Sequence, residues 1–213
     1  MNVVFDFGAV LFTWRPAELV AQCFPEVAAT PQQAGQLAHA VFGHPDWHNF
    51  DRGTLPLAEV VRRTAQRLDL NPAVLTELVE SIGERLVPIP DTLALLAQLH
   101  AQRTATAPGV RLYFLSNMPV PYARTLERLH PFLRWFDGGI FSGDVHHIKP
   151  ESEIYQLLQT RYALEPAQTV FIDDLLGNVQ AAQALGWHGI HFESAQQLRT
   201  PLERWMGQAH RGH

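Results

Sequence analysis

The sequence predicts an α/β protein with a doubly wound, mostly parallel sheet, and three observations support this class. Short apolar runs typical of buried strands alternate with amphipathic segments of helical length. Strands that alternate with such helices imply right-handed crossovers and parallel pairing. The chain of 213 residues is long enough for one such core and a smaller second domain. In this architecture, ligands bind at the carboxyl ends of the strands.

Each expected strand is short and is bounded by turn-forming or polar residues. The strands are expected at residues 2–7, 110–115, 139–141, 169–173 and 189–192. The helices between and after them are expected at residues 91–100, 121–129, 150–162, 178–185 and 195–206. We expect Pro150 at the first helical position of the third helix, because the fixed φ of proline suits that position.

One segment lacks strand patterns and interrupts the alternation. Its helical patterns are at residues 16–24, 31–42, 57–68 and 72–86. Pro88 and Pro90 follow it and suit a stiff linker. We therefore expect a Rossmann-like core formed by residues 1–13 and 88–213, and a small inserted α-helical cap formed by residues 14–87.

Composition and charge argue against several classes of partner. The formal net charge is −5 and there is no long basic run, so we expect no nucleic acid or membrane partner. No apolar run approaches the roughly 18 residues needed to span a bilayer, and no secretory signal pattern is present. The single cysteine, Cys23, excludes an internal disulfide and fits a reducing compartment. We expect a cytoplasmic protein, whose oligomeric state the sequence leaves open.

Polar residues able to perform chemistry lie at the expected strand ends and just before one helix. They are Asp6 in FDFGAVL, where Gly8 follows two positions later, Ser116 and Asn117 in FLSN, Lys149 in IKPE, and Asp173, Asp174 and Asn178 in FIDDLLGN. Because the carboxyl ends of parallel strands meet at one edge of a sheet, we expect Asp6, Ser116, Lys149 and Asp174 to converge there.

Several carboxylates at one edge favour a divalent cation, which offsets their mutual repulsion. Mg²⁺ prefers oxygen ligands and typically takes one or two protein carboxylates, waters and a phosphate oxygen. The Lys149 ammonium is able to pair with Asp6 and with an anionic substrate. The Ser116 hydroxyl and nearby backbone N–H groups are able to donate to phosphate oxygens. The pattern is typical of a covalent phosphoryl-transfer site in which an aspartate attacks phosphorus.

The ordered motifs and the helical insertion resemble the haloacid dehalogenase superfamily, and in particular the capped branch that includes α-glucose-1-phosphate phosphatases. The resemblance extends from residue 2 to about residue 192. It implies Mg²⁺-dependent hydrolysis of small phosphate monoesters, with sugar phosphates among the candidates. The small phosphorylated metabolite would form an aspartyl-phosphate intermediate on Asp6.

The resemblance also implies the metal site. Asp6 would be both nucleophile and metal ligand. The backbone carbonyl of Gly8 and the carboxylate of Asp174 would complete the protein ligands. Asp173 and Asn178 would support these ligands from behind or bind the metal through water.

The phosphoryl group would be held by a second set of side chains. Ser116 and Lys149 would bind the group during transfer, with Asn117 beside them as a substrate-binding residue. Ser116 and Lys149 are therefore counted with Asp6 as the catalytic residues.

Gly8 departs from the family pattern, because most family phosphatases place there an aspartate that protonates the leaving oxygen and later activates water. Such proton transfer is typically worth about 10² to 10⁴ in rate, whereas phosphate monoester hydrolysis is accelerated by up to roughly 10²¹. We therefore expect a slower phosphatase, or one that takes its proton from water, the substrate or the cap. Candidate donors are His44, His48, His146 and His147.

Other interpretations remain open. A haloacid dehalogenase-type hydrolase would use Asp6 without a metal, although the pair Asp173 and Asp174 argues against it. A non-catalytic phosphate-binding protein of the same fold is the third option. The letters FDRGTL at residues 50–55 imitate the opening motif. No apolar strand precedes them, so we expect no catalytic role for Asp51.

Overall fold

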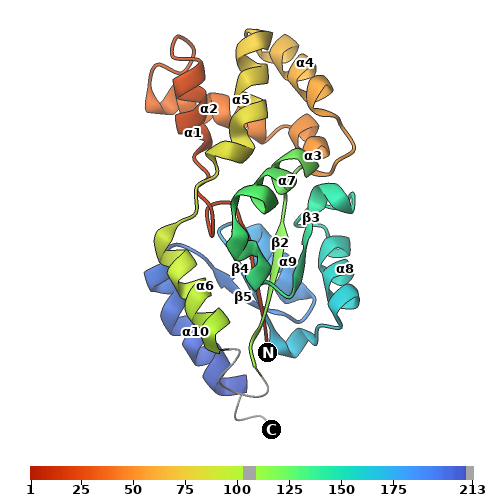
Figure 1. Cartoon of the computed structure of the whole chain (residues 1–213). Helices are drawn as coiled ribbons and strands as arrows, with labels where there is room; N and C mark the ends of the chain where they lie inside the picture. The colour runs from red at the N-terminus through yellow and green to blue at the C-terminus, as the bar shows by residue number, and fades with distance from the viewer. Residues whose placement is uncertain (103–108, 210–213) are drawn as a thin grey trace.

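The computed structural model describes residues 1–102 and 109–209, whose strands form one five-stranded sheet (Figure 1). The strands are β1 (Asn2–Phe5), β2 (Arg111–Ser116), β3 (Gly138–Phe141), β4 (Thr169–Asp173) and β5 (His188–His191). Their order is β3-β2-β1-β4-β5, and every pairing is parallel. The predicted fold class is confirmed.

Helices cover both faces of this sheet. They are α6 (Pro90–Gln102), α7 (Val120–Leu129), α8 (Ser152–Tyr162), α9 (Leu176–Ala184) and α10 (Ala195–Ala209). Val3 and Phe5 pack in one apolar cluster with α6 and α10, whereas Val4 packs in another with α8 and α9. This alternation follows from the two-residue period of a strand and explains why Val3, Val4 and Phe5 are all apolar.

The expected elements are present, with ends shifted by a few residues, but the start of α8 was predicted wrongly. Pro150 lies outside the helix, which begins at Ser152. The Glu151 N–H donates to the Ile148 carbonyl oxygen (2.9 Å) and closes a turn just before the helix. The chain therefore turns at the Lys149–Pro150 peptide, which is cis, before it becomes helical.

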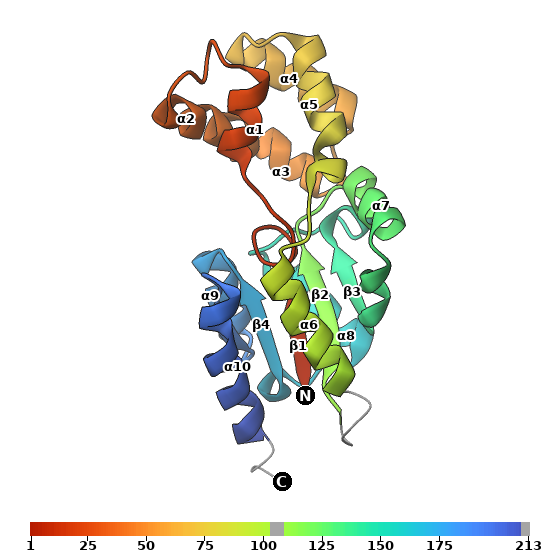
Figure 2. The ribbon, with the colours of Figure 1, turned by 60° about the vertical axis from the view of Figure 1, so that its left-hand side comes forward.

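The insertion contains the expected helices and a short additional one. The helices are α1 (Pro16–Cys23), α2 (Pro31–Phe42), α3 (Pro45–Asp51), α4 (Leu57–Leu68) and α5 (Pro72–Arg85). Figure 2 shows this group beyond the end of the sheet toward which the strand arrows point. We keep the division into core and cap as a proposal supported by this placement. Within the described ranges, no helix is long and apolar enough to cross a membrane.

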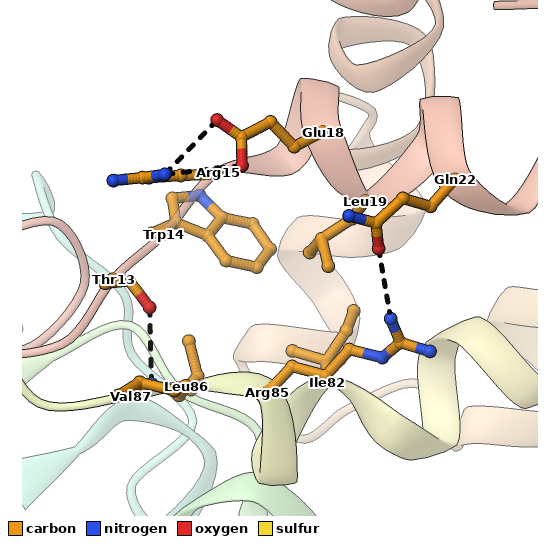
Figure 3. Close-up of a pocket in the computed structure, with 10 residues that line it drawn as sticks. All are labelled: Thr13, Trp14, Arg15, Glu18, Leu19, Gln22, Ile82, Arg85, Leu86 and Val87. Carbon is orange, nitrogen blue, oxygen red and sulfur yellow. Dashed lines mark hydrogen bonds and ion pairs between the residues drawn. The ribbon is translucent and has the colours of Figure 1, made fainter.

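The two segments that connect the cap to the core run side by side. The Thr13 N–H donates to the Val87 carbonyl oxygen (2.8 Å), and the Val87 N–H donates to the Thr13 hydroxyl (3.2 Å; Figure 3). The Ile89 N–H donates to the Leu11 carbonyl oxygen (2.8 Å). The chain therefore enters and leaves the cap at one place.

Candidate active site

Asp6 lies just beyond the end of β1. Its N–H donates to the Ile172 carbonyl oxygen (2.9 Å), which continues the pairing with β4 and fixes the backbone at the sheet edge. Its Oδ1 lies 2.8 Å from the Lys149 Nζ, while its Oδ2 accepts no hydrogen bond from any described residue. Burial raises the pKa of Asp6, and the Lys149 ammonium opposes this shift. Oδ2 is therefore left to attack a phosphorus atom, and Oδ1, which has Lys149 as its one partner among the described residues, keeps a lone pair for a metal ion.

Lys149 lies between two carboxylates. Its Nζ is 2.8 Å from Asp6 and 2.6 Å from Asp173, and its side chain is 1% exposed. Burial lowers the pKa of Lys149, but these carboxylates outweigh that effect and the net shift is upward. The buried ammonium therefore stays charged and pairs with the two anions beside it.

Asn117 binds the backbone of Lys149. The Lys149 N–H donates to the Asn117 Oδ1 (2.8 Å), and the Asn117 Nδ2 donates to the Lys149 carbonyl oxygen (3.0 Å). Asn117 also lines the cavity described below. Its predicted contact with substrate stays a prediction, whereas its amide is already engaged in positioning the lysine.

Asp173 is fully buried at the end of β4. Its Oδ1 accepts from the Leu175 N–H (2.8 Å) and from the Asn178 Nδ2 (3.0 Å). Its Oδ2 accepts from the Lys149 Nζ (2.6 Å) and also from Asn178 (3.1 Å). Because both oxygens are occupied, Asp173 is suited to holding Lys149 and Asn178 in place.

The carboxylates of Asp6, Asp173 and Asp174 offer oxygens that all lie within 4.8 Å of one another. Asp174 is half-buried, and burial together with the charge of Asp173 raises its pKa. Hard oxygen donors at this spacing suit Mg²⁺. Since the oxygens of Asp173 are engaged, Asp6 and Asp174 are the carboxylates that fit the metal, with the Gly8 carbonyl nearby in the same cavity.

A cavity of about 260 Å³ lies between this edge of the sheet and the cap. The predicted site residues that line it are Asp6, Gly8, Ser116, Asn117, Lys149, Asp174 and Asn178. The Ser116 hydroxyl, at the end of β2, makes no hydrogen bond to any described residue. The structure thus brings the motif residues together as expected, with Asp173 behind the cavity wall.

The cap contributes mostly apolar side chains to this cavity, namely Trp14, Phe42, Trp47, Ile82 and Leu86. Trp47 is 5% exposed and packs edge-to-face against Phe42, with 4.6 Å between ring centroids. Trp14, Ile82 and Leu86 also line a second cavity of about 250 Å³ (Figure 3). They therefore form a shared wall between the two spaces.

Asp51, for which the sequence predicted no catalytic role, also lines the cavity. Burial raises the pKa of Asp51 to about 8, although the Lys149 charge lowers it. Helix α3, which carries Asp51, is too short for a periodicity to reveal it. The sequence feature that could have predicted the start of this helix is Pro45, because proline is favoured at the first helical position.

Of the four candidate histidines, His48 alone lines the cavity in the described part of the chain. It lies at an exposed position, and burial and the nearby Arg52 lower its pKa. The His44 Nδ1 accepts from the Asp46 N–H and caps α3. The His146 Nδ1 lies 3.0 Å from the Arg52 carbonyl oxygen, so it is also engaged elsewhere.

Comparison with known proteins agrees with this geometry. The family model of the haloacid dehalogenase-like hydrolases matches residues 2–186. The sesquiterpene phosphatase astK of Aspergillus oryzae is 27% identical over 205 residues, which cover 96% of this chain and 95% of that protein. The phosphoglycolate phosphatase of Salmonella typhimurium is 30% identical over 107 residues, which cover 50% of this chain and 40% of that protein.

Among solved structures, the HAD family enzyme bt-2542 of Bacteroides thetaiotaomicron, in its magnesium complex, superposes with a TM-score of 0.70. It is 20% identical, and the match covers 95% of this chain and 98% of that one. This likeness supports the fold.

The fold and the acidic site define a hydrolase with a phosphatase-like centre. The chain belongs to the haloacid dehalogenase-like hydrolases. The predicted superfamily and the predicted enzyme class, a phosphatase of this family, are confirmed.

Proposed function

We propose that the chain is a Mg²⁺-dependent phosphatase that transfers the phosphoryl group of a small monoester to Asp6. The observation that carries the proposal is the free Oδ2 of Asp6, placed in a cavity beside the Lys149 ammonium and the Asp174 carboxylate. A nucleophilic carboxylate is productive only where nearby cations disperse the phosphate charge.

The residues divide the work as follows. The Lys149 ammonium and the Ser116 hydroxyl bind phosphate oxygens, and Asp6 attacks phosphorus as the bond to the leaving oxygen breaks. Water then attacks the aspartyl-phosphate, the bond between phosphorus and Asp6 breaks, and inorganic phosphate leaves. When bound by Asp6, Asp174 and the Gly8 carbonyl, Mg²⁺ supplies further neutralisation of the phosphate charge.

The cavity also supports a substrate class. A sugar ring needs partners for several hydroxyl groups, because buried polar groups without hydrogen bonds cost free energy. The cap offers only His48 and Asp51 as polar side chains on the described cavity wall. At the core side, Leu175 adds an exposed apolar surface. We therefore propose phosphate monoesters of apolar alcohols, in preference to the sugar phosphates suggested by the resemblance. The similarity to a sesquiterpene phosphatase supports the same choice.

The experiment is a phosphate-release assay with straight-chain alkyl phosphates of increasing length, an isoprenyl monophosphate and glucose 1-phosphate. We expect kcat/KM to rise about fourfold for each buried CH₂, at about 0.8 kcal/mol each, until the cavity is filled. Chelation of Mg²⁺ and the Asp6→Asn variant should each abolish release. Turnover that survives in Asp6→Asn would refute the mechanism, and a preference for glucose 1-phosphate would refute the substrate class.

A further inference from the structure

The proposed reaction requires a proton for the leaving oxygen, and Gly8 supplies none. An alcohol leaves poorly as an alkoxide, so a positioned acid typically contributes about 10² to 10⁴ in rate. Besides the carboxylates assigned to the metal, the titratable cavity residues without a role are His48, Asp51 and Tyr122. These three are therefore the candidate proton donors for the reaction given above as the proposed function, and the assignment rests on that function.

The backbone on both sides of the Asp51 side chain is anchored to the core. The Ser142 hydroxyl donates to the Asp51 carbonyl oxygen (2.6 Å), and Ser142 is fully buried. The next residue, Arg52, forms two hydrogen bonds to the Glu151 carboxylate (2.7 and 2.6 Å). On the other side, the Phe50 ring packs edge-to-face on Tyr122, with 5.6 Å between centroids. These contacts hold the end of α3 against the active-site edge of the core.

None of these contacts involves the Asp51 carboxyl group. It makes no hydrogen bond to any described residue, and it lines the same cavity as Asp6 and Lys149. Burial raises its pKa to about 8, against the effect of Lys149, so that it holds its proton at neutral pH. A half-buried carboxylic acid that lines a reactive site is an arrangement that enzymes use for general acids.

The two rivals are less suitable. The Tyr122 hydroxyl donates its proton in a hydrogen bond to the Val79 carbonyl oxygen (2.6 Å). Burial also raises the pKa of Tyr122, so the hydroxyl is a poor proton donor to a leaving group. His48 has its pKa lowered by burial and by Arg52, which leaves it neutral and without a proton to give readily.

We propose that Asp51, supplied by the cap, is the general acid and base that replaces the aspartate missing at Gly8. In the first step, Asp6 attacks phosphorus, the bond from phosphorus to the ester oxygen breaks, and that oxygen takes the proton of the Asp51 carboxyl. In the second step, the Asp51 carboxylate accepts a proton from water as the water oxygen attacks the aspartyl-phosphate. Asp6 leaves as a carboxylate, and Asp51 is protonated again.

The test compares two leaving groups in the full-length protein with Mg²⁺. Butyl phosphate needs a protonated leaving oxygen, whereas 4-nitrophenyl phosphate releases a stable anion. For Asp51→Asn, we expect kcat/KM to fall by about 10² to 10⁴ with butyl phosphate and by less than about tenfold with 4-nitrophenyl phosphate. A merely structural role would lower both values equally, and this outcome would overturn the proposal.

Two further variants sharpen the test. Asp69→Asn changes an exposed cap aspartate outside this cavity and should leave both rates unchanged. In the double variant Gly8→Asp, Asp51→Asn, we expect butyl phosphate hydrolysis to recover. There is room for the new side chain, because a Cβ at Gly8 meets only Trp14, at 3.9 Å.

Selective loss of butyl phosphate hydrolysis in His48→Gln, with Asp51→Asn unaffected, would assign the acid to His48 and overturn the proposal. If Asp6→Asn still hydrolyses 4-nitrophenyl phosphate, or if the wild type does not hydrolyse it, the proposed function fails. That result is distinct from failure of the proton-transfer role.

Discussion

Asn117 and Lys149 form a closed pair in which one side-chain amide satisfies both the N–H and the carbonyl of the lysine backbone. Asn117→Ala removes both partners at once. An unsatisfied buried backbone group costs about 1 to 3 kcal/mol, so we expect urea unfolding to show a loss of about 2 kcal/mol, together with a lower kcat/KM. A residue that only contacts substrate would lower kcat/KM and leave the urea midpoint unchanged.

The Lys149 ammonium between Asp6 and Asp173 should contribute strongly to the free energy of unfolding. Lys149→Met leaves two buried carboxylates without their cation, and breaking a buried ion pair in this way costs about 3 to 5 kcal/mol. Urea unfolding in chelator measures the effect on the metal-free protein. As a control, Lys149→Arg keeps the charge and should retain more stability. Equal stability of the methionine variant and wild type would contradict the arrangement.

The Arg52–Glu151 ion pair joins the cap to the core. Its side chains are 24% and 35% exposed, so we expect Arg52→Gln to lower stability by only about 0.5 to 1 kcal/mol. Because the pair holds the end of α3 over the cavity, KM for alkyl phosphates should rise several-fold.

A double-mutant cycle with Glu151→Gln measures the coupling between Arg52 and Glu151. Arg62→Gln, which breaks an ion pair with Glu59 inside the cap, is the matched control and should leave KM unchanged. If the effects of Arg52→Gln and Glu151→Gln on KM are additive, the two side chains do not act as a pair that holds α3 in place.

Ionisation of Asp51 should lower the free energy of unfolding as the pH rises. Its pKa of about 8 in the folded protein lies above the ordinary value of 3.8 for an aspartate, so the native protein holds a proton that the unfolded chain releases. Unfolding therefore becomes easier between about pH 4 and pH 8. Asp51→Asn removes this effect and should be more stable than wild type at pH 8, by up to about 5 kcal/mol, with the difference vanishing near pH 4.

Thermal or urea unfolding across this pH range measures the effect. Asp69→Asn, at an exposed position, is the matched control for the loss of one carboxylate. A pH-independent difference between wild type and Asp51→Asn would mean that Asp51 ionises normally in the folded protein.

The sequence was sufficient for the parallel core, because the strands are short apolar runs and their ends carry the motif residues. Asp6 and Asp174 meet for a topological reason, since β1 and β4 are parallel neighbours. The position of Asp51 in the cavity could not be predicted from strand order. It depends on contacts of Ser142 and Glu151 with α3, which join residues 91 and 99 positions apart. No local pattern records such contacts.

The side-by-side connections of the cap also bear on how the chain folds. The pairing of Asn2 with Arg111 in β1 and β2 closes a loop of roughly 110 residues. If the cap folds first and joins Thr13 to Val87, the effective loop shortens to about 35 residues. Loop-closure entropy grows with the logarithm of length, so this saves about 1 kcal/mol when the central strands meet. In that order of folding, the cap would bring the first strand near its partner before the rest of the core exists.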